Sequence, residues 1–291
     1  NPNKKYFLVT DDNVHRLYSS IILQLTNIQT YILPPGEASK NMQNSNAIIK
    51  ELLEHNYTKD DYLIAFGGGV IGDLTGFVAG IYKRGINYIN IPTTLISQVD
   101  SSIGGKVAVN FEGFKNQVGL IYHPELILID PILLKTLPEE EYLSGMGEVV
   151  KYAALFSEEM FIKLETKDYQ LIEIIRKCLE LKVKLTLVDE FDKGERQLLN
   201  FGHTIGHAIE AKYHMLHGIA IGYGMYLESK NLRLKQLLES LGFDFSKDFV
   251  DLETYIKQDK KIRNGKITKV KLIKIGEARL EEGEIDEYFY E

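Results

Sequence analysis

The stretch that decides the fold is YLIAFGGGVIGDLTGF, residues 62–77. Its first five residues form a short apolar run typical of a buried strand, and three glycines follow directly. The pattern Gly67-x-Gly69-x-x-Gly72, placed between a strand and a helix, is typical of dinucleotide-binding sites. Glycines let the backbone approach a pyrophosphate, and the N-terminus of the next helix offers N–H donors to it. The stretch therefore predicts a nucleotide-binding strand–turn–helix unit; a glycine-rich turn that only packs a strand against a helix is the alternative.

One part of the usual dinucleotide pattern is missing. An acidic residue about twenty positions after the glycines ordinarily binds the adenine ribose. Asn87 and Asn90 occupy that region here. A nucleotide ribose must therefore be held differently, and Asp73, directly after the glycines, is one candidate.

Further short apolar runs lie on both sides of this stretch. They cover residues 6–10, 30–33, 88–91 and 126–130, and a helical pattern covers Ser45 to Glu54. Asp11, Asp12 and Asn13 are suitable caps for a helix that begins near Val14. Strands that alternate with helices predict an α/β fold with a Rossmann-like, mostly parallel sheet and helices on its faces.

The character of the chain changes after Leu137 and Pro138. From Glu139 to about Glu239 the pattern is that of successive helices with hardly any strand signal. We therefore expect an α/β domain over residues 1–139 and a mostly α-helical domain over residues 140–291. A chain of 291 residues is long enough for each domain to bury a core of its own.

Composition excludes several classes of protein. The hydrophobic fraction of 44% and the charged fraction of 26% are those of a globular protein, and the net charge of −7 argues against nucleic acid or an anionic membrane as the main partner. No run is long enough to span a bilayer, and the first residues show no signal-peptide pattern. Cys178 is the single cysteine, so neither a disulfide framework nor a thiolate metal cluster is expected. These features predict a cytoplasmic protein.

Histidines are concentrated in NFGHTIGHAIEAKYHMLH, residues 200–217, which hold four of the seven in the chain. His203 and His207 are four apart in a segment expected to be helical, so both side chains lie on one face. Imidazole is a common zinc ligand, and a helical pair at this spacing can bind a metal at two points. A helix with a His-rich surface is the alternative, and the spacing leaves both open.

A carboxylate and an amine lie close together in SGMGEVVKYA, residues 144–153. Glu148 and Lys151 are three apart and therefore neighbours on a helical face. Such a pair is commonly a surface ion pair. Here the flanking residues are mostly apolar, and charges within an apolar helix usually have a partner or a function. One carboxylate added to two imidazoles would complete a His-His-Glu catalytic zinc set.

The segment PTTLISQVDSSIGGKVAVNFEGFKN, residues 92–116, is rich in small polar groups. So many such groups pack poorly in a core and suit a surface that binds a phosphorylated or polyhydroxylated ligand. A solvated loop is the alternative. The candidate side chains are Thr93, Thr94, Asp100, Ser101, Ser102, Lys106, Lys115 and Asn116.

Taken together, these segments resemble the 3-dehydroquinate synthase family. The resemblance extends from about Asp11 to Lys261, and its segments occur in the order and with the spacing of the family. They are GGGVIGDLTGFVAG (67–80), RGINYINIPTTLISQVDSSIGGKVAVN (84–110), FKNQVG (114–119), SGMGEVVKYA (144–153), DEFDKGERQLLNFGHTIGHAIE (189–210) and LHG (216–218).

The resemblance implies an enzyme of the shikimate pathway, which leads to chorismate and the aromatic amino acids. It would convert 3-deoxy-D-arabino-heptulosonate 7-phosphate to 3-dehydroquinate and inorganic phosphate. The implied steps are transient oxidation by NAD, β-elimination of phosphate, re-reduction, ring opening and aldol closure. The implied cofactors are NAD and a divalent metal, zinc or cobalt, and the implied active site lies in the cleft between the two domains.

Site residues carried over from the resemblance differ from those that spacing suggests. The implied metal ligands are Glu148, His203 and His217, and His207 becomes a neighbour that contacts substrate or handles protons. Implied catalytic residues are Lys151, His207, Asp100, Lys182 and Arg196. Implied substrate- and phosphate-binding residues are Arg84, Lys106, Lys115, Asn116, Lys182, Arg196, Asn200, Lys260 and Lys261, with Arg84 reaching the neighbouring active site of a homodimer. Implied NAD-binding residues are Glu37, Lys40, Gly68, Gly69, Asp73, Thr93, Thr94, Lys106, Lys115 and Thr136.

Three other functions stay open at this point. Another sugar-phosphate cyclase, such as a 2-deoxy-scyllo-inosose synthase, would share the first steps but use a different sugar; Asn200 and the DKK segment at 259–261 favour the dehydroquinate branch. A metal-dependent polyol dehydrogenase of related fold would accumulate NADH. A nucleotide-binding module with a vestigial metal site would have no turnover.

Overall fold

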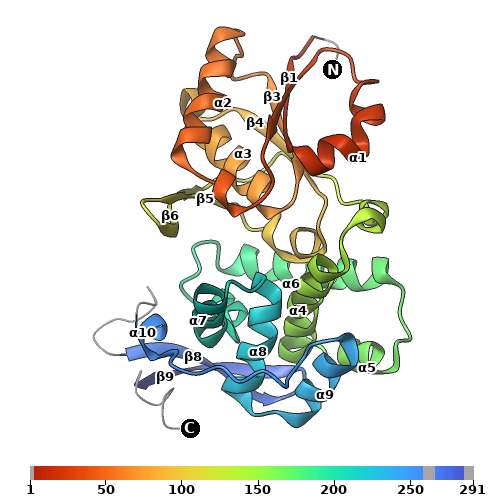
Figure 1. The fold of residues 1–291 in the computed structure, drawn as a ribbon, viewed down its shortest axis with the longest axis vertical. Helices are drawn as coiled ribbons and strands as arrows, with labels where there is room; N and C mark the ends of the chain where they lie inside the picture. Colours follow the sequence, from red (N-terminus) through yellow and green to blue (C-terminus); the bar gives the residue numbers. More distant parts are fainter. Residues whose placement is uncertain (1–2, 258–265, 285–291) are drawn as a thin grey trace. The chain divides into compact units, whose positions relative to one another are not determined.

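The computed structural model describes residues 3–257 and 266–284, and the chain divides into two compact units, Asn1–Leu137 and Pro138–Glu291 (Figure 1). The first unit contains a five-stranded sheet in the order β2-β1-β3-β4-β7, and every neighbouring pair in it is parallel. Its strands are β1 (Tyr6–Asp11), β2 (Ile28–Leu33), β3 (Tyr62–Gly67), β4 (Asn87–Pro92) and β7 (Leu126–Ile127). Its α-helices are α1 (Asp12–Ile22), α2 (Met42–Glu54) and α3 (Gly69–Ile81). The predicted parallel sheet with intervening helices is confirmed.

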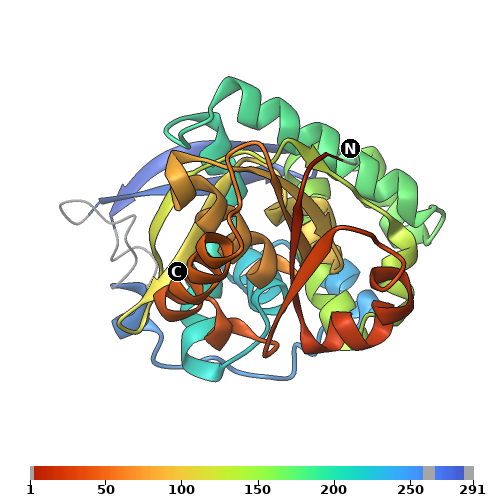
Figure 2. The ribbon, with the colours of Figure 1, turned by 90° about the horizontal axis from the view of Figure 1, so that it is seen from above.

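Side chains alternate along each strand, so the sheet has two apolar faces. Phe7, Val9 and Leu63 pack in one core with α2 and α3, whereas Leu8 and Ile64 pack with α1 in the other. Figures 1 and 2 show α1 on one side of the strands and α2 and α3 on the other. Each fully buried Leu or Phe side chain contributes about 1.5–3 kcal/mol, so these two cores hold the carboxyl ends of the strands in place.

The ends of the first-unit elements follow local signals. Asp11 caps α1, accepting hydrogen bonds from the backbone nitrogens of Asn13 (2.9 Å) and Val14 (3.0 Å), as its position in the sequence predicted. The run at residues 126–130 forms a strand only over its first two residues. Asp130 then caps the 3-10 helix η4 (Pro131–Thr136), and Pro131, which has no N–H, cannot continue the strand pairing.

The polar segment after β4 is more ordered than a solvated loop. It forms the π-helical turn η3 (Ser97–Ser101) and the antiparallel hairpin of β5 (Lys106–Phe111) and β6 (Phe114–Ile121). Glu112 and Gly113 connect the two strands with φ values of 48° and 83°, the left-handed pair that a tight hairpin requires. Val107 and Val109 of β5 are buried in the core under α3. Two short 3-10 helices, η1 (Glu37–Ser39) and η2 (Tyr82–Arg84), complete the unit.

The second unit is mostly helical, as predicted. Its helices are α4 (Glu139–Phe156), α5 (Glu158–Thr166), α6 (Leu171–Val188), η5 (Glu195–Asn200), α7 (His203–Tyr213), α8 (His217–Ser229), α9 (Leu232–Leu241) and α10 (Glu253–Ile256). Among the described residues, none of the helices has both the length and the apolar character needed to cross a bilayer.

One element of the second unit was not predicted. β8 (Lys266–Lys274) and β9 (Glu277–Glu284) form an antiparallel hairpin, drawn in blue in Figure 1. Gly276 in its turn has a φ of 87°, and its nitrogen donates to the carbonyl of Ala154 at 2.8 Å, which ties the turn to α4. The signal that could have found it is the run of β-branched residues between lysines, ITKVKLI at 267–273.

Candidate active site

Glycines bring two helix backbones of the second unit into direct contact. A Cβ atom at Gly147 of α4 would overlap the carbonyl oxygen of Gly218 on α8, and a Cβ at Gly218 would overlap the carbonyl oxygen of Ser144. The Gly218 nitrogen also donates to the hydroxyl of Ser144 at 3.0 Å. Because Glu148 follows Gly147 and His217 precedes Gly218, this contact places a carboxylate and an imidazole next to each other.

A second glycine contact fixes α7 against α8. Gly202, with a φ of 75°, precedes α7, and a Cβ at Gly224 of α8 would overlap the Gly202 carbonyl oxygen. The carboxylate of Glu228 on α8 accepts from the backbone nitrogens of Gly202 (2.8 Å) and Ile205 (3.3 Å). It therefore caps the N-terminus of the helix that begins with His203.

These contacts assemble one carboxylate and three imidazoles. Glu148 is fully buried, and its Oε1 lies 3.8 Å from Nε2 of His203 and 3.4 Å from Nε2 of His217. One nitrogen from each of His203, His207 and His217 lies within 4.8 Å of the others. Nitrogen and carboxylate donors gathered at this distance fit a divalent metal such as zinc or cobalt.

The other oxygen of Glu148 has a different neighbour. Lys151, one turn along α4, forms an ion pair with Oε2 and is only 1% exposed. A buried ion pair costs desolvation energy, so it is seldom retained for stability alone. The ammonium group of Lys151 holds the carboxylate so that Oε1 faces the imidazoles.

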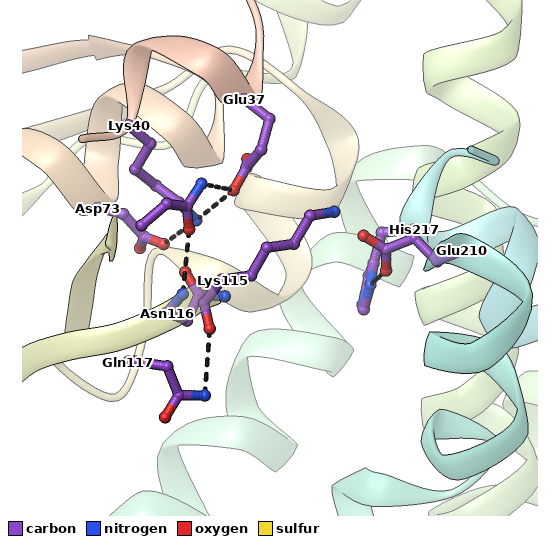
Figure 3. A network of polar contacts seen from close by, with 9 residues as sticks. Glu37, Lys40, Asp73, Lys115, Asn116, Gln117, Glu210 and His217 are labelled. Carbon is purple, nitrogen blue, oxygen red and sulfur yellow. Dashed lines mark hydrogen bonds and ion pairs between the residues drawn. The ribbon is translucent and has the colours of Figure 1, made fainter. Parts of the chain in front are cut away.

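The ring orientation of two histidines is set by acceptors at Nδ1. Nδ1 of His203 lies 3.0 Å from the carbonyl oxygen of Phe201, and Nδ1 of His217 lies 2.8 Å from Oε2 of Glu210 (Figure 3). Burial lowers the pKa of His217, but hydrogen bonds with Glu148 and Glu210 outweigh it and raise that pKa to about 9. His207 is exposed, and its ring meets that of His203 edge-on at 5.2 Å. Because their Nδ1 atoms are held by these acceptors, His203 and His217 direct Nε2 toward Glu148, which favours them as ligands beside that carboxylate.

Two cations predicted to bind phosphate are buried in the same unit. Lys182 of α6 is 6% exposed and Arg196 of η5 is 4% exposed. The guanidinium of Arg196 donates to the carbonyl of Glu190 at 2.8 Å, and its backbone nitrogen donates to Asp189 at 3.1 Å. Asn200 ends η5, three residues before His203. Lys260 and Lys261, also predicted for phosphate, lie outside the described residues.

In the first unit the glycine-rich segment forms the predicted turn between β3 and α3. Gly68 occupies the N-cap position of α3, where a Cβ would lie 3.0 Å from Cγ2 of Thr94. A Cβ at Gly69 would lie 3.3 Å from the hydroxyl of Ser101. Thr93 is buried, and its nitrogen donates to the carbonyl of Gly67 at 2.9 Å. The helix N-terminus is thus surrounded by hydroxyls, an arrangement that fits a pyrophosphate.

The order of the strands also indicates a ligand site at the carboxyl ends of the strands, where the Gly68 turn lies. In doubly wound sheets a ligand binds outside the carboxyl ends of the strands, where the strand order reverses. Residues after β2, β3 and β4 are the candidates Glu37, Gly68 and Thr93, so three loops of that edge carry predicted nucleotide-binding residues.

A buried lysine joins several of these candidates. Nζ of Lys40 lies 3.1 Å from Oδ2 of Asp73 and 3.2 Å from Oε1 of Glu37, and Lys40 is only 5% exposed (Figure 3). Burial lowers the pKa of Lys40, but the two carboxylates outweigh that effect and hold the pKa above its ordinary value. Asn110 of β5, which sequence reasoning missed, donates to Glu37 at 2.8 Å and accepts from the backbone nitrogen of Asn116 at 3.0 Å.

The remaining first-unit candidates are mostly exposed. Lys106, Lys115 and Asn116 lie on the β5–β6 hairpin, and Asp100 lies half-buried in η3. The hydroxyl of Thr136, in η4, lies 2.8 Å from that of Tyr18. Arg84 is exposed at the end of η2, with a φ of 65°.

Two family models cover most of the chain. Residues 30–144 match the model described as 3-dehydroquinate synthase N-terminal, and residues 145–262 match 3-dehydroquinate synthase C-terminal. The chain belongs to the 3-dehydroquinate synthase family.

Curated relatives in this family are similar over about four fifths of their own length. The 3-dehydroquinate synthase of Alkaliphilus metalliredigens is 40% identical over 91% of this chain and 82% of its own. That of Dictyoglomus thermophilum is 42% identical, with coverage of 95% and 84%, and that of Clostridium perfringens is 44% identical, with coverage of 86% and 79%.

Solved structures share the fold at lower identity. ValA, the 2-epi-5-epi-valiolone synthase of Streptomyces hygroscopicus with NAD+ and Zn2+ bound, superposes with a TM-score of 0.89 at 24% identity and covers 98% of this chain and 90% of its own. A 2-deoxy-scyllo-inosose synthase complexed with carbaglucose-6-phosphate, NAD+ and Co2+ gives 0.85 at 22%, with coverage of 97% and 88%. An iron-containing alcohol dehydrogenase is more distant, at 0.61 and 15%, covering 89% of this chain and 85% of its own.

Proposed function

We propose that this protein catalyses the reaction of 3-dehydroquinate synthases, the conversion of 3-deoxy-D-arabino-heptulosonate 7-phosphate to 3-dehydroquinate and inorganic phosphate. The observation that carries the proposal is the buried Glu148 carboxylate within 4 Å of two imidazoles, in a chain about 40% identical to curated members of the family. Buried carboxylate–imidazole clusters of this kind are typical of metal sites rather than of packing.

We propose Glu148, His203 and His217 as the ligands of a divalent metal, and the loops around Gly68 and Thr93 as the NAD site. When bound, the metal supplies Lewis-acid activation of a substrate oxygen, and NAD supplies reversible acceptance of a hydride. The donor set fits zinc and cobalt alike, and solved structures of the same fold contain NAD+ with either metal.

The other residues of the second unit have roles that follow from charge and exposure. Lys182 and Arg196 are buried cations suited to offset the charge of a phosphate as it leaves. His207 is exposed within the imidazole cluster, so it can exchange a proton with bound substrate. Lys151 orients Glu148 from the same face of α4 and is proposed as a catalytic residue.

First-unit residues complete the proposal. Lys106, Lys115 and Asn116 are proposed to bind substrate or the NAD phosphates, and Asp100 to assist catalysis. Glu37, Lys40, Asp73, Thr94 and Thr136 are proposed to hold the rest of NAD. Lys40 supports this role because it ties Glu37 to Asp73, the acidic residue directly after the glycines that is the candidate for holding the ribose.

The decisive experiment is a phosphate-release assay on metal-free protein. We expect phosphate release from the heptulosonate substrate only when NAD and a divalent metal are both added, with no net NADH at 340 nm because the hydride returns. Phosphate release from glucose 6-phosphate instead would indicate an inosose-type cyclase. NADH that accumulates in step with product would indicate a polyol dehydrogenase, and NAD binding without any turnover would leave only a binding module.

We further propose a cytoplasmic homodimer in which Arg84 reaches the active site of the neighbouring subunit. The exposed position of Arg84 at the end of η2 is compatible with this role. If Arg84→Ala protein regains up to half of the wild-type activity when subunits are exchanged with an inactive Glu148→Gln protein, the cross-subunit role is supported. A monomer in sedimentation analysis at the assay concentration would contradict it.

A further inference from the structure

Glu210 contacts the histidine cluster from the same helical face as two of its members. It lies seven residues after His203 and three after His207 on α7, spacings that put all three on one side of a helix. Its Oε2 is 2.8 Å from Nδ1 of His217, which is the first residue of α8 (Figure 3). Its side chain is 16% exposed. Glu210 is not among the ligands or substrate-binding residues proposed above.

The chemistry of this contact determines where His217 carries a proton. An ionised carboxylate only accepts hydrogen bonds, so Nδ1 of His217 must be the donor. In the neutral ring, the lone pair is then on Nε2, the nitrogen 3.4 Å from Oε1 of Glu148. His203 has the same arrangement, because a backbone carbonyl, that of Phe201, lies 3.0 Å from its Nδ1.

His217 depends on such a partner more than His203 does. The side chain of His217 is 34% exposed, against 13% for His203. It also begins its helix, directly after the short connection that contains His214 with a φ of 53°. A partly exposed ring at a helix start can turn toward solvent unless a partner holds it, whereas the backbone of α8 is held separately by the Gly218–Ser144 contact.

We infer that Glu210 is a positioning residue for metal binding, which holds the His217 ring by its Nδ1–H so that Nε2 presents its lone pair beside Glu148. The inference rests on the proposed metal set of Glu148, His203 and His217. The second negative charge also helps to offset a divalent cation, since Lys151 already neutralises much of the charge of Glu148.

The test compares two variants, Glu210→Gln and Glu210→Ala, by the affinity of the metal-free protein for Zn2+ in competition with a chromophoric chelator. Loss of a carboxylate behind a histidine ligand typically weakens metal binding about 10- to 100-fold. We expect a loss in that range for Glu210→Ala. A smaller loss is expected for Glu210→Gln, because the amide oxygen still accepts from Nδ1.

A matched control separates positioning from general stability. Glu165→Gln makes the same chemical change in a partly buried carboxylate that binds Arg233, at 2.7 and 2.9 Å. We expect it to lower the melting temperature of the metal-free protein but to leave the Zn2+ affinity and the rise in melting temperature on adding Zn2+ unchanged. In the Glu210 variants the Zn2+ affinity should be lower than in wild type. The rise in melting temperature on adding Zn2+, measured against the metal-free form of the same variant, should also be smaller than in wild type.

Each outcome has a distinct meaning. Both Glu210 variants binding Zn2+ with wild-type affinity would overturn the role of Glu210 and leave the proposed metal set intact. An equal loss of affinity in Glu165→Gln would show that the effect is one of stability, which also overturns the inference. Wild-type protein that binds no Zn2+ would overturn the metal set itself and this inference with it.

Discussion

The histidine cluster of the second unit and the Lys40 network of the first are both polar assemblies around a buried charged side chain, Glu148 in one and Lys40 in the other, but they are built differently. The cluster is positioned by helix backbones that touch at Gly147, Gly218 and Gly224. The Lys40 network is positioned by side chains, an ammonium group between two carboxylates of separate elements. Backbone contacts tolerate little movement, whereas a long lysine side chain adapts. We therefore expect the histidine cluster to hold a ligand in fixed geometry and the Lys40 network to adjust to a flexible one.

The largest expected effect is that of Glu148→Gln. The amide cannot supply a charged ligand, and it leaves Lys151 buried without its ion-pair partner at Oε2. We expect metal affinity to fall by more than about 100-fold and turnover to be lost, because removing a ligand costs more than the 10- to 100-fold typical of an outer partner. Elemental analysis measures the loss of metal, and phosphate release measures the loss of turnover.

The same variant tests the independence of the two regions. NAD affinity, measured by titration calorimetry, should stay within about twofold of wild type, since the Lys40 network is built from other elements. A large loss of NAD affinity in Glu148→Gln would break the comparison.

His217→Ala and His207→Ala should differ in kind. His217 is oriented toward Glu148 by Glu210, so its loss should lower metal affinity about as strongly as the Glu148 substitution. His207 is exposed, so its loss should leave metal content near one ion per chain and reduce turnover about 10²- to 10⁴-fold, as for a proton-transfer group. If His207→Ala loses the metal and His217→Ala retains it, the spacing-based pair of His203 and His207 is the correct one.

Gly218→Ala tests the backbone contact itself. The added methyl would overlap the carbonyl of Ser144, and neither backbone can yield without separating α4 from α8. Overpacking of this kind costs about 1–3 kcal/mol, which urea unfolding can measure. Metal affinity should fall as well, because the same movement separates Glu148 from His217. Unchanged unfolding with full metal affinity would show that the helices need not touch.

The smallest effect is expected from Lys40→Met, the corresponding change in the first region. It leaves Glu37 and Asp73 as two carboxylates without their shared ammonium group, at a cost of about 1–3 kcal/mol because both are partly exposed. NAD affinity should decrease while metal affinity does not change.

The stability difference between wild type and Lys40→Met should depend on pH in a definite direction. The folded state holds the pKa of Lys40 above its ordinary value, so its contribution is complete below pH about 10.4 and is lost as pH rises further. The stability gap between wild type and Lys40→Met should be constant from pH 6 to 9 and shrink above the ordinary lysine pKa. A gap that closes between pH 6 and 9 would contradict this account.

Local sequence signals predicted most of the first unit correctly. The run at residues 62–66 followed by glycines, and the further short runs, became β3 and its parallel neighbours because buried strands need continuous apolar stretches with turn residues at their ends. Asp11 caps α1 for an equally local reason. The hairpin of β8 and β9 was missed, since its lysines obscure the β-branched residues between them.

The sequence by itself determined the alternation of strands and helices that forms the parallel sheet, the glycine turn before α3, and the pairing of Glu148 with Lys151 on one helix. These depend on neighbours within a few positions, where helical and strand periodicities apply. Spacing along the chain suggested His207 as the partner of His203, and the family resemblance implied His217; the tertiary structure shows His217 beside Glu148. Only the tertiary structure decided that Glu210 lies behind His217 and that Lys40 joins Glu37 to Asp73. Residues on different elements meet through packing, here through glycines that let α4, α7 and α8 touch, and spacing along one helix contains no information about that contact.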